Sequence, residues 1–362
     1  MAGQISMMRI QVIALLIALC ISNIEGGTYK VLSLNMANYN DHPYWDQRAE
    51  EIAQIIASAE PDLVALQEPR FDTDVQSTMK SYQNAAEQVL YLLNFKYNSF
   101  QGAYVTTQPL MHYPTQASLL RGSAPVPSES RQQLEAAVFA DLEPHAQHEI
   151  KSSTDPQMVM DTFVSTESAY RYPIASQYAP YNITQYWEGL TLISRRSPFL
   201  QTGTRFLTLF PDCPDSNVRG TQYTLQRTTN TTSPSDFYLF NTHFGLNSVC
   251  QSENADETIS YIASLGTPQS FKLLVGDFNT TPSSPAINAI IKAGFVDLWA
   301  LLNPTLPGYT HPSNAPSSRI DYMFALPSLS KFATSIQLIG TKPNSQNIYP
   351  SDHFGLLATF TF

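Results

Sequence analysis

Short apolar runs that stop at polar residues recur along the chain, and they predict strands with polar ends. Residues 29–35 alternate in polarity and end at Asn35. Residues 63–66 are continuously apolar, a pattern typical of a strand buried on both faces, and Gln67 and Glu68 follow directly. An unpaired charge at the end of a buried strand is costly, so Glu68 is a candidate functional residue.

The same pattern predicts further strands, and a different spacing of apolar residues predicts helices. The further strands are expected at residues 187–194, 205–210, 220–227, 237–243, 271–277, 319–324 and 354–362. Helices are expected at residues 45–58, 71–93, 128–139, 255–265 and 285–293. Many strands with few helices between them predict two packed sheets flanked by helices, an α/β architecture. Residues from about 100 to 180 have a weak pattern, and we expect them to be a variable insertion.

The first 26 residues differ from the rest of the chain. They contain Arg9, then an apolar run at residues 10–21, then small residues up to Gly27. We expect residues 1–26 to be a secretory signal peptide and the mature protein to be secreted into the extracellular space. The apolar run is shorter than the roughly 20 residues that a membrane anchor needs, and no later stretch predicts a transmembrane segment.

Composition narrows the possible classes of protein. Hydrophobic residues make up 43% of the chain and aromatic residues 11%, which supports a sizeable core and excludes a disordered chain. Lys and Arg number 20 against 30 Asp and Glu, a net charge of −10, which argues against a broad basic surface for nucleic acid. A bound divalent cation can still supply positive charge locally, so a phosphate-handling site remains open.

Cysteine usage agrees with an exported protein. Cys20 lies in the predicted signal peptide, and Cys213 and Cys250 remain. In an oxidising compartment we expect these two to form a disulfide, the alternative being two buried free thiols. Asn182 and Asn230 open glycosylation sequons in polar stretches and are predicted glycan sites.

Polar residues at six strand ends predict one functional site. They are Asn35, Glu68, His243, Asp277 with Asn279, Asp321, and the pair Asp352 and His353. In a layered α/β fold such ends meet at one edge. The set is rich in oxygen ligands and lacks cysteine, so we predict Mg²⁺, with Mn²⁺ or Ca²⁺ as alternatives, rather than zinc.

These residues also carry a family resemblance. The ordered motifs are Asn35, Gln67-Glu68, Thr242-His243, Gly276-Asp277-Phe278-Asn279, Arg319-Ile320-Asp321-Tyr322 and Ser351-Asp352-His353. Their order and strand contexts resemble the endonuclease/exonuclease/phosphatase superfamily, which includes deoxyribonuclease I, abasic-site endonucleases, inositol polyphosphate 5-phosphatases and neutral sphingomyelinases. The resemblance implies a four-layer α/β sandwich, a single domain over residues 27–362, and a metal-dependent hydrolase acting on phosphate esters.

The resemblance also implies roles for the residues nearest the metal. Glu68 would hold the divalent cation, and Asn35 and Asp352 would complete its shell directly or through water. His353, oriented by Asp321, would act as general base or acid at the attacking water, since an imidazole fixed by a carboxylate moves protons near neutral pH.

Further roles follow for residues around the phosphoryl group. Asp277 would orient the nucleophile, and Asn279 and His243 would donate hydrogen bonds to phosphoryl oxygens. Which histidine is the acid and which the base stays open. Asn279 also opens a sequon, and a cleft position predicts that it carries no glycan.

Two more residues resemble positions of deoxyribonuclease-like members. Glu188 would hydrogen-bond His243. Arg70 would approach a nucleic-acid backbone, and a surface ion pair is its alternative role.

The substrate stays open between several classes. Phosphodiester hydrolysis of a nuclease-like kind is our first expectation. Cys250 follows His243 closely, as in secreted bacterial sphingomyelinases, so a phospholipid headgroup is the alternative substrate to nucleic acid. A catalytically silent binding or effector protein on the same fold is the third possibility. We expect a monomer.

Overall fold

A computed structural model describes residues 27–38, 42–72, 84–111, 186–195, 197–207, 219–227 and 236–362. The predicted signal peptide, the predicted helix at residues 128–139, Cys213, Asn182 and Asn230 lie outside these residues. Each described helix falls short of the length or hydrophobicity that a membrane span requires.

Two mixed sheets form the centre of the described structure. The first has seven described strands: β1 (Thr28–Asn35), β2 (Leu63–Gln67), β3 (Phe71–Asp72), β4 (Tyr104–Met111), β5 (Tyr186–Ser194), β12 (Ala333–Ile339) and β13 (Gly355–Thr361). Their order is β12-β13-β1-β2-β5-β3, and β4 also pairs with β5. Only β1 and β2 run parallel among these described pairs, with Asn35 beside Gln67.

The second sheet has six described strands. They are β6 (Gln201–Phe206), β7 (Gly220–Arg227), β8 (Asp236–His243), β9 (Phe271–Asp277), β10 (Val296–Asp297) and β11 (Asp321–Ala325), in the order β10-β11-β9-β8-β7-β6. Parallel pairing of β8 with β9 puts His243 beside Asp277, and antiparallel pairing of β11 with β9 puts Asp321 beside Asp277. The sheet register therefore brings three predicted site residues to one edge.

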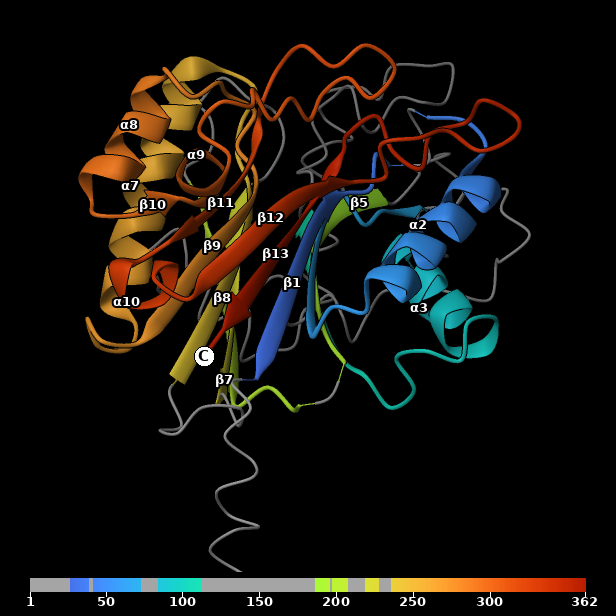
Figure 1. Cartoon of the computed structure of the whole chain (residues 1–362), viewed down its shortest axis with the longest axis horizontal. Coiled ribbons are helices and arrows are strands. Elements are labelled where there is room, and N and C mark those ends of the chain that lie inside the picture. Colours follow the sequence, from blue (N-terminus) through green and yellow to red (C-terminus); the bar gives the residue numbers. More distant parts are fainter. Residues whose placement is uncertain are drawn as a thin grey trace, which may run out of the picture.

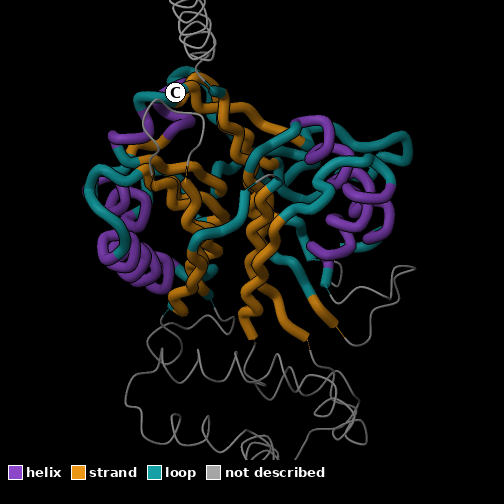
Figure 2. Tube along the Cα trace, turned by 90° about the horizontal axis from the view of Figure 1, so that it is seen from below, coloured by secondary structure: helices purple, strands orange, loops and turns teal. Residues whose placement is uncertain are grey.

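Helices cover the outer faces of both sheets (Figure 1). The helices on these faces are α2 (Trp45–Ala59), α3 (Ala85–Phe95), α7 (Ser248–Ser264) and α8 (Pro285–Lys292). The short helices α9 (Leu298–Leu302) and α10 (Pro327–Ser330) instead bury Leu298 and Leu329 in the apolar cluster between the sheets. Helices α2 and α3 flank the first sheet, and α7 and α8 flank the second. The second view also shows strands between two outer groups of helices (Figure 2). The predicted four-layer α/β sandwich is confirmed.

Three apolar layers hold these four layers together. Between the sheets, the buried side chains include Val31 from β1, Leu239 from β8 and Met323 from β11. A second cluster lies between the first sheet and α2 and α3, and a third between the second sheet and α7 and α8. Central strands are therefore buried on both faces, which explains their continuous apolar runs.

Several predicted elements differ from the structure. The helix expected at residues 71–93 is wrong in its first part, because Phe71–Asp72 form a strand and α3 begins at Ala85. The side chain of Asn84 caps that helix by accepting a hydrogen bond from the Glu87 amide. Helix α7 begins at Ser248, earlier than the expected residue 255, after an Asn247 cap. Strands β4 and β12 were not predicted.

Gly276 in β9 provides a test of how tightly the parallel strands pack. Its φ is +144°, and a Cβ there would lie 2.0 Å from the Thr242 carbonyl oxygen in β8. We expect Gly276→Ala to lower the free energy of unfolding by about 3 kcal/mol, because the strands must separate and the backbone conformation disfavours a side chain. Urea denaturation measures the loss.

Gly294→Ala is the matched control. Its φ is +96°, but nothing lies within 4 Å of the added Cβ, so only the backbone strain of about 1 kcal/mol applies. Equal losses in the two variants would contradict the close approach of β8 and β9.

Candidate active site

The predicted strand-end residues come together where the two sheets meet. Asn35 ends β1 and Glu68 follows β2 in the first sheet. His243 ends β8, Asp277 ends β9 and Asp321 begins β11 in the second sheet. Residues far apart in the sequence therefore share one site because the strands of both sheets end at the same edge.

The side chain of Asn35 joins the two sheets at this edge. Its Nδ2 donates to Oε1 of Glu68 at 2.9 Å and to Oδ2 of Asp277 at 3.0 Å. Its Oδ1 accepts from the Ala37 amide at 2.9 Å, and the residue is fully buried. One amide thus contacts a carboxylate from each sheet, which fixes the distance between them.

Glu68 is held as an anion. The Asn38 backbone amide and side-chain Nδ2 donate to its Oε2 at 3.0 and 3.2 Å. Burial raises the pKa of Glu68, but the hydrogen bonds from Asn38 and Asn35 favour the anion, and the pKa lies below its ordinary value. Glu68 has a φ of +58°, a left-handed backbone conformation that is uncommon for residues other than glycine. The chain adopts this conformation in the turn directly after β2.

His353 is paired with a carboxylate as predicted. Its Nδ1 lies 2.9 Å from Oδ2 of Asp321, and its Nε2 lies 3.8 Å from Oδ2 of Asp277. Burial lowers the pKa of His353, but Asp321 and Asp277 raise it well above its ordinary value. The backbone amide of His353 donates to Ser351 Oγ at 3.0 Å, and that hydroxyl donates to the Asn35 carbonyl at 2.7 Å. These bonds anchor the ring beside the first sheet.

Asp277 lies at the centre of the site and is almost fully buried. Burial and then repulsion by Asp321 raise the pKa of Asp277 to about 7. Its Oδ1 accepts from the Asn279 amide at 2.8 Å, and its Oδ2 lies 3.5 Å from Nε2 of His243. A carboxyl group with this pKa can exchange a proton near neutral pH.

Arg219 is a site residue that the sequence did not predict. It is buried, and its Nη1 lies 3.1 Å from Nδ1 of His243. Burial, followed by the charge of Arg219, lowers the pKa of His243 well below its ordinary value, so this imidazole is neutral at pH 7. The register of β7 and β8 pairs Gly220 with His243. Predicting that these two strands pair as a hairpin would therefore have placed Arg219, the residue before Gly220, beside His243.

Two roles drawn from the resemblance need correction. Glu188 was expected to contact His243, but its Oε1 accepts from Asn38 Nδ2 at 2.9 Å and lies 3.4 Å from Nη1 of Arg70. Arg70 was expected to approach a substrate, but its side chain is only 2% exposed. The two residues form a buried ion pair that supports Asn38, which in turn holds Glu68.

The remaining predicted residues lie around the centre. Asn279 has a φ of +51°, and its Nδ2 donates to the Phe244 carbonyl at 2.9 Å, which leaves one amide hydrogen for another acceptor. Asp352 is 30% exposed and lies 3.8 Å from Nε2 of His353. Burial raises the pKa of Asp352, but the hydrogen bond from His311 and the charges of nearby histidines lower it to about 2.

The donor set fits a divalent cation. Ligand atoms lie within 4.8 Å of one another in three groups of described residues: Glu68, His243 and Asp277; Asp277, Asp321 and His353; and His311, Asp352 and His353. Burial, and then the charge of Asp321, raises the pKa of Asp277, and a cation bound beside these carboxylates would favour their ionised forms. Carboxylate and amide oxygens suit Mg²⁺, Mn²⁺ and Ca²⁺.

Comparisons with known proteins agree with this geometry. Residues 22–353 match the model of the Endonuclease/Exonuclease/phosphatase family. No curated protein matched by sequence.

Solved structures share the fold at low sequence identity. A Leptotrichia buccalis endonuclease/exonuclease/phosphatase family protein is 17% identical, with a TM-score of 0.58 over 92% of this chain and 100% of its own. A mannosyl-6-phosphatase from Bacteroides thetaiotaomicron is 16% identical, with a TM-score of 0.55 over 92% and 100%. TDP2 from D. rerio, complexed with a single strand DNA product, is 16% identical, with a TM-score of 0.53 over 93% and 100%.

Replacement of Asp321 tests the electrostatics of the site. Its charge raises the pKa of both Asp277 and His353, so Asp321→Asn should lower both values. If hydrolysis needs ionised Asp277 and protonated His353, both limbs of the pH profile of kcat/KM should move to lower pH. We also expect kcat to fall by about 10².

Asp256→Asn, at an exposed position of α7, is the control and should leave the profile in place. If the pH profile of Asp321→Asn has the same two limbs as the wild-type profile, ionisation of Asp277 and His353 does not control the rate.

Proposed function

Because the chain belongs to the endonuclease/exonuclease/phosphatase family, whose members hydrolyse phosphate esters, we propose that it is a Mg²⁺-dependent phosphodiesterase with nuclease-like activity. One observation carries this proposal: the Asp321–His353 pair faces Asp277 beside Glu68 and Asn35. A proton-transfer pair and an oxygen-rich cation site thus share one buried edge.

Glu68 is the proposed principal ligand of the cation, and Asp352 is proposed to complete the shell. Asn35 directs its amide nitrogen at Glu68 and Asp277, so its role is to position these carboxylates. A cation held at Glu68 would supply positive charge against the phosphoryl oxygens and would ease departure of the leaving oxygen. Asn38 and the Arg70–Glu188 ion pair behind it hold Glu68 in place. This support keeps the ligand oxygens fixed before the substrate arrives.

Asp277 and His353 are the proposed proton carriers. Asp277, which lies between the two histidines, accepts a proton from the attacking water. His353, protonated because its pKa is raised, donates a proton toward the leaving oxygen, and Asp321 keeps its ring oriented. This assignment makes His353 the acid and leaves His243 outside the proton transfer.

His243 and Arg219 are proposed to stabilise charge on the phosphoryl group. The guanidinium lies against the neutral imidazole, so positive charge is available within the buried site. Asn279 can add its second amide hydrogen to the same oxygens. An acidic protein can therefore bind an anionic substrate through a few local donors.

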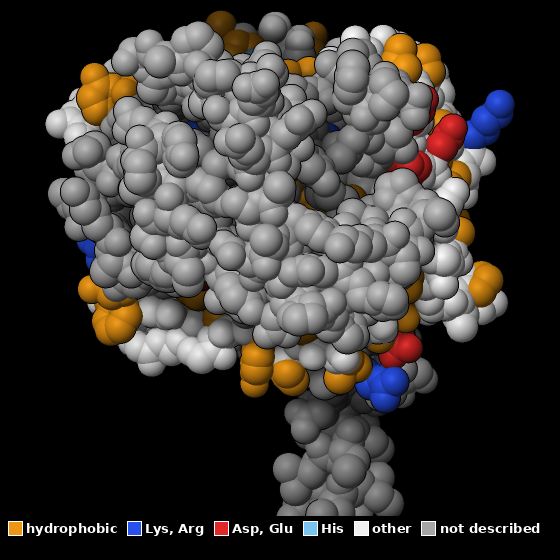
Figure 3. All heavy atoms as spheres, turned by 180° about the vertical axis from the view of Figure 1, so that it is seen from behind, with side chains coloured by type: hydrophobic (Ala, Val, Ile, Leu, Met, Phe, Trp, Pro, Cys, Tyr) orange, Lys and Arg blue, Asp and Glu red, His pale blue; other side chains and the backbone are white. Residues whose placement is uncertain are grey.

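The net charge favours a substrate that needs few contacts outside the site. On the face seen in Figure 3, the described Lys, Arg, Asp and Glu side chains are scattered and of both signs. A net charge of −10 also disfavours a long electrostatic track for duplex DNA. We therefore expect short or single-stranded nucleic acid to be cleaved better than long duplex.

One observation favours a phospholipid headgroup as the second candidate substrate. Leu246 and Val249, shortly after His243, are 66% and 52% exposed. Apolar side chains beside a phosphoesterase site suit a substrate that lies in a membrane surface. A catalytically silent protein is the remaining alternative, and turnover of any ester would exclude it.

A substrate panel with one ligand variant tests the proposed function. Purified protein is assayed with Mg²⁺, Mn²⁺ or Ca²⁺ on single-stranded DNA, plasmid DNA, RNA, sphingomyelin vesicles, an aryl phosphodiester and an aryl phosphomonoester. We expect Mg²⁺-dependent diester cleavage that falls at least about 10²-fold in Glu68→Gln, because the cation loses its anionic ligand.

Glu60→Gln is the control, since that glutamate is 61% exposed and pairs with Arg195. Full activity in excess chelator would overturn the metal mechanism. Faster cleavage of sphingomyelin than of any nucleic acid would select the second candidate.

Export of the protein is a further part of the proposal. It rests on the signal-like segment at residues 1–26 and on the predicted Cys213–Cys250 disulfide. Secreted material should begin near residue 27, and peptide mapping without reduction should recover the two cysteines joined. Glycopeptide analysis should find Asn279 bare, with Asn182 and Asn230 as the expected glycan sites. Two free thiols in exported protein would contradict the disulfide.

A further inference from the structure

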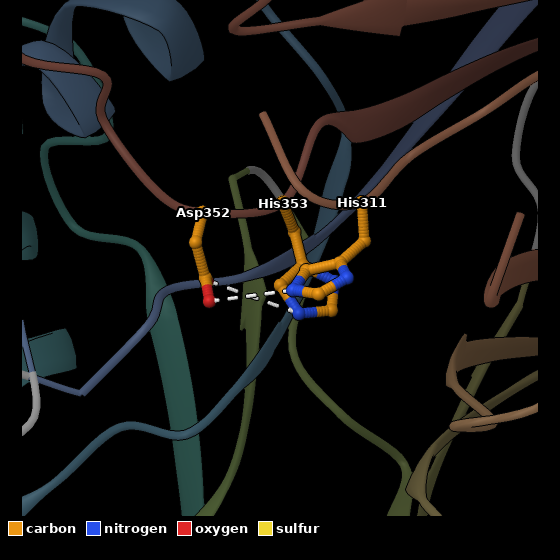
Figure 4. Close-up of side chains that lie close together, drawn as sticks. All are labelled: His311, Asp352 and His353. Atoms are coloured by element: carbon orange, nitrogen blue, oxygen red, sulfur yellow. Dashed lines mark ion pairs between the residues drawn. The ribbon is translucent and has the colours of Figure 1, made fainter. Parts of the chain in front are cut away.

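A histidine cluster lies at the outer side of the site, around Asp352. Nε2 of His311 lies 3.7 Å from Oδ2 of Asp352, and Nε2 of His353 lies 3.8 Å from Oδ1. Figure 4 shows the ring nitrogens of both histidines directed toward the carboxylate. The ring centroids of His311 and His353 are 4.7 Å apart. Nε2 of His42 lies 3.4 Å from Oδ2 of the same carboxylate.

Backbone hydrogen bonds hold this cluster together. The Phe354 amide donates to the Thr310 carbonyl at 2.7 Å, and the Ser313 amide donates to the Asp352 carbonyl at 2.7 Å. The loop that carries His311 is therefore tied to the loop that carries Asp352 and His353. The backbone hydrogen bonds between these loops therefore hold the side chains of His311, Asp352 and His353 close together.

Arg48 links the segment that carries His42 to the loop that carries Asp352. Its Nη2 donates to the His42 carbonyl at 3.4 Å, and its Nη1 donates to the Pro350 carbonyl at 3.3 Å. The guanidinium is buried beneath both segments. His42 is therefore kept beside the Asp352 loop, where it can orient the carboxylate.

The three ligand atoms of His311, Asp352 and His353 lie within 4.8 Å of one another. A tetrahedral zinc ion with bonds of about 2.0–2.1 Å separates its ligands by about 3.3 Å, so modest side-chain rotation closes the group around one ion. His311 is 36% exposed and has room to make that movement. Nδ1 of His353 is already paired with Asp321, which leaves Nε2 as the ligating nitrogen.

We propose that His311, Asp352 and His353 form a second cation site that binds Zn²⁺ or a similar borderline divalent ion. Two imidazoles and one carboxylate suit Zn²⁺ better than Mg²⁺, which prefers oxygen ligands in an octahedral shell. The oxygen-rich group at Glu68 and Asn35 keeps the opposite preference. His42 is a positioning residue that holds Asp352.

The second site has a consequence for catalysis, which rests on the proposed function. Zn²⁺ held at His353 Nε2 would displace to solvent the proton that this nitrogen donates toward the leaving oxygen. It also takes Asp352 from the shell of the catalytic cation. Zn²⁺ bound here therefore inhibits hydrolysis while Mg²⁺ supports it.

Calorimetric titration with Zn²⁺ in excess Mg²⁺ tests the site without any assay of activity. We expect one Zn²⁺ per chain in the full protein, with a Kd at least 100-fold weaker in His311→Ala because a ligand is lost. His42→Ala should weaken binding about tenfold, and His42→Gln, which keeps a donor for Asp352, should recover most of that loss. His311→Gln repeats the ligand test with a bulkier side chain if His311→Ala is poorly folded.

Asp256→Asn, at an exposed position of α7 outside the cluster, is the control and should bind Zn²⁺ like the wild type. Wild-type affinity in both His311 variants, or no Zn²⁺ binding in the full protein, would overturn the site. Absence of inhibition by bound Zn²⁺ would overturn only the catalytic consequence. Loss of all hydrolysis in Mg²⁺ would instead count against the proposed function and leave the calorimetric result valid.

Discussion

Burial of several carboxylates at one edge of two packed sheets is the constraint on which the rest of the site depends. Burial, and then repulsion by Asp321 on the neighbouring strand, raises the pKa of Asp277 to about 7. The Asn35 amide and the His353 imidazole are the groups that compensate this charge. An isolated buried carboxylate would be far more costly, so the protein gathers its acids where donors and a cation can meet them.

The same edge is stiffened by amide side chains between the sheets. Gln67 Nε2 donates to Oδ1 of Asn241 at 2.7 Å, and Asn241 Nδ2 donates to the carbonyls of Leu66 and Thr191 at 2.9 and 3.2 Å. Together with Asn35, these bonds connect β8 and β9 to β1, β2 and β5. A slip between the sheets would break several buried hydrogen bonds at once, and the site geometry is rigid for that reason.

Strand ends were predictable because parallel neighbours bring their polar ends to one edge, and this reasoning located Asn35, Glu68 and Asp277. Contacts that depend on loops were not predictable from periodicity, and Arg219 and His311 were missed for this reason. Strand β12 was missed because its Thr, Ser and Gln residues leave most of it partly exposed and give weak alternation. The roles expected for Glu188 and Arg70 came from resemblance alone, and the two side chains pair with each other.

The groups proposed for hydrolysis and the groups proposed for selecting substrate and metal lie on different parts of the fold. Groups on strand ends are set by sheet register, so a fold shared at 14–17% identity can keep them together. Arg219, His42 and His311 come from connecting segments, which can change without disturbing the sheets. Under the proposed function, a protein of net charge −10 needs local cationic or cation-binding groups to hold an anionic substrate. Changes in the loops would then alter substrate choice and metal preference, whereas changes at the strand ends would remove hydrolysis itself.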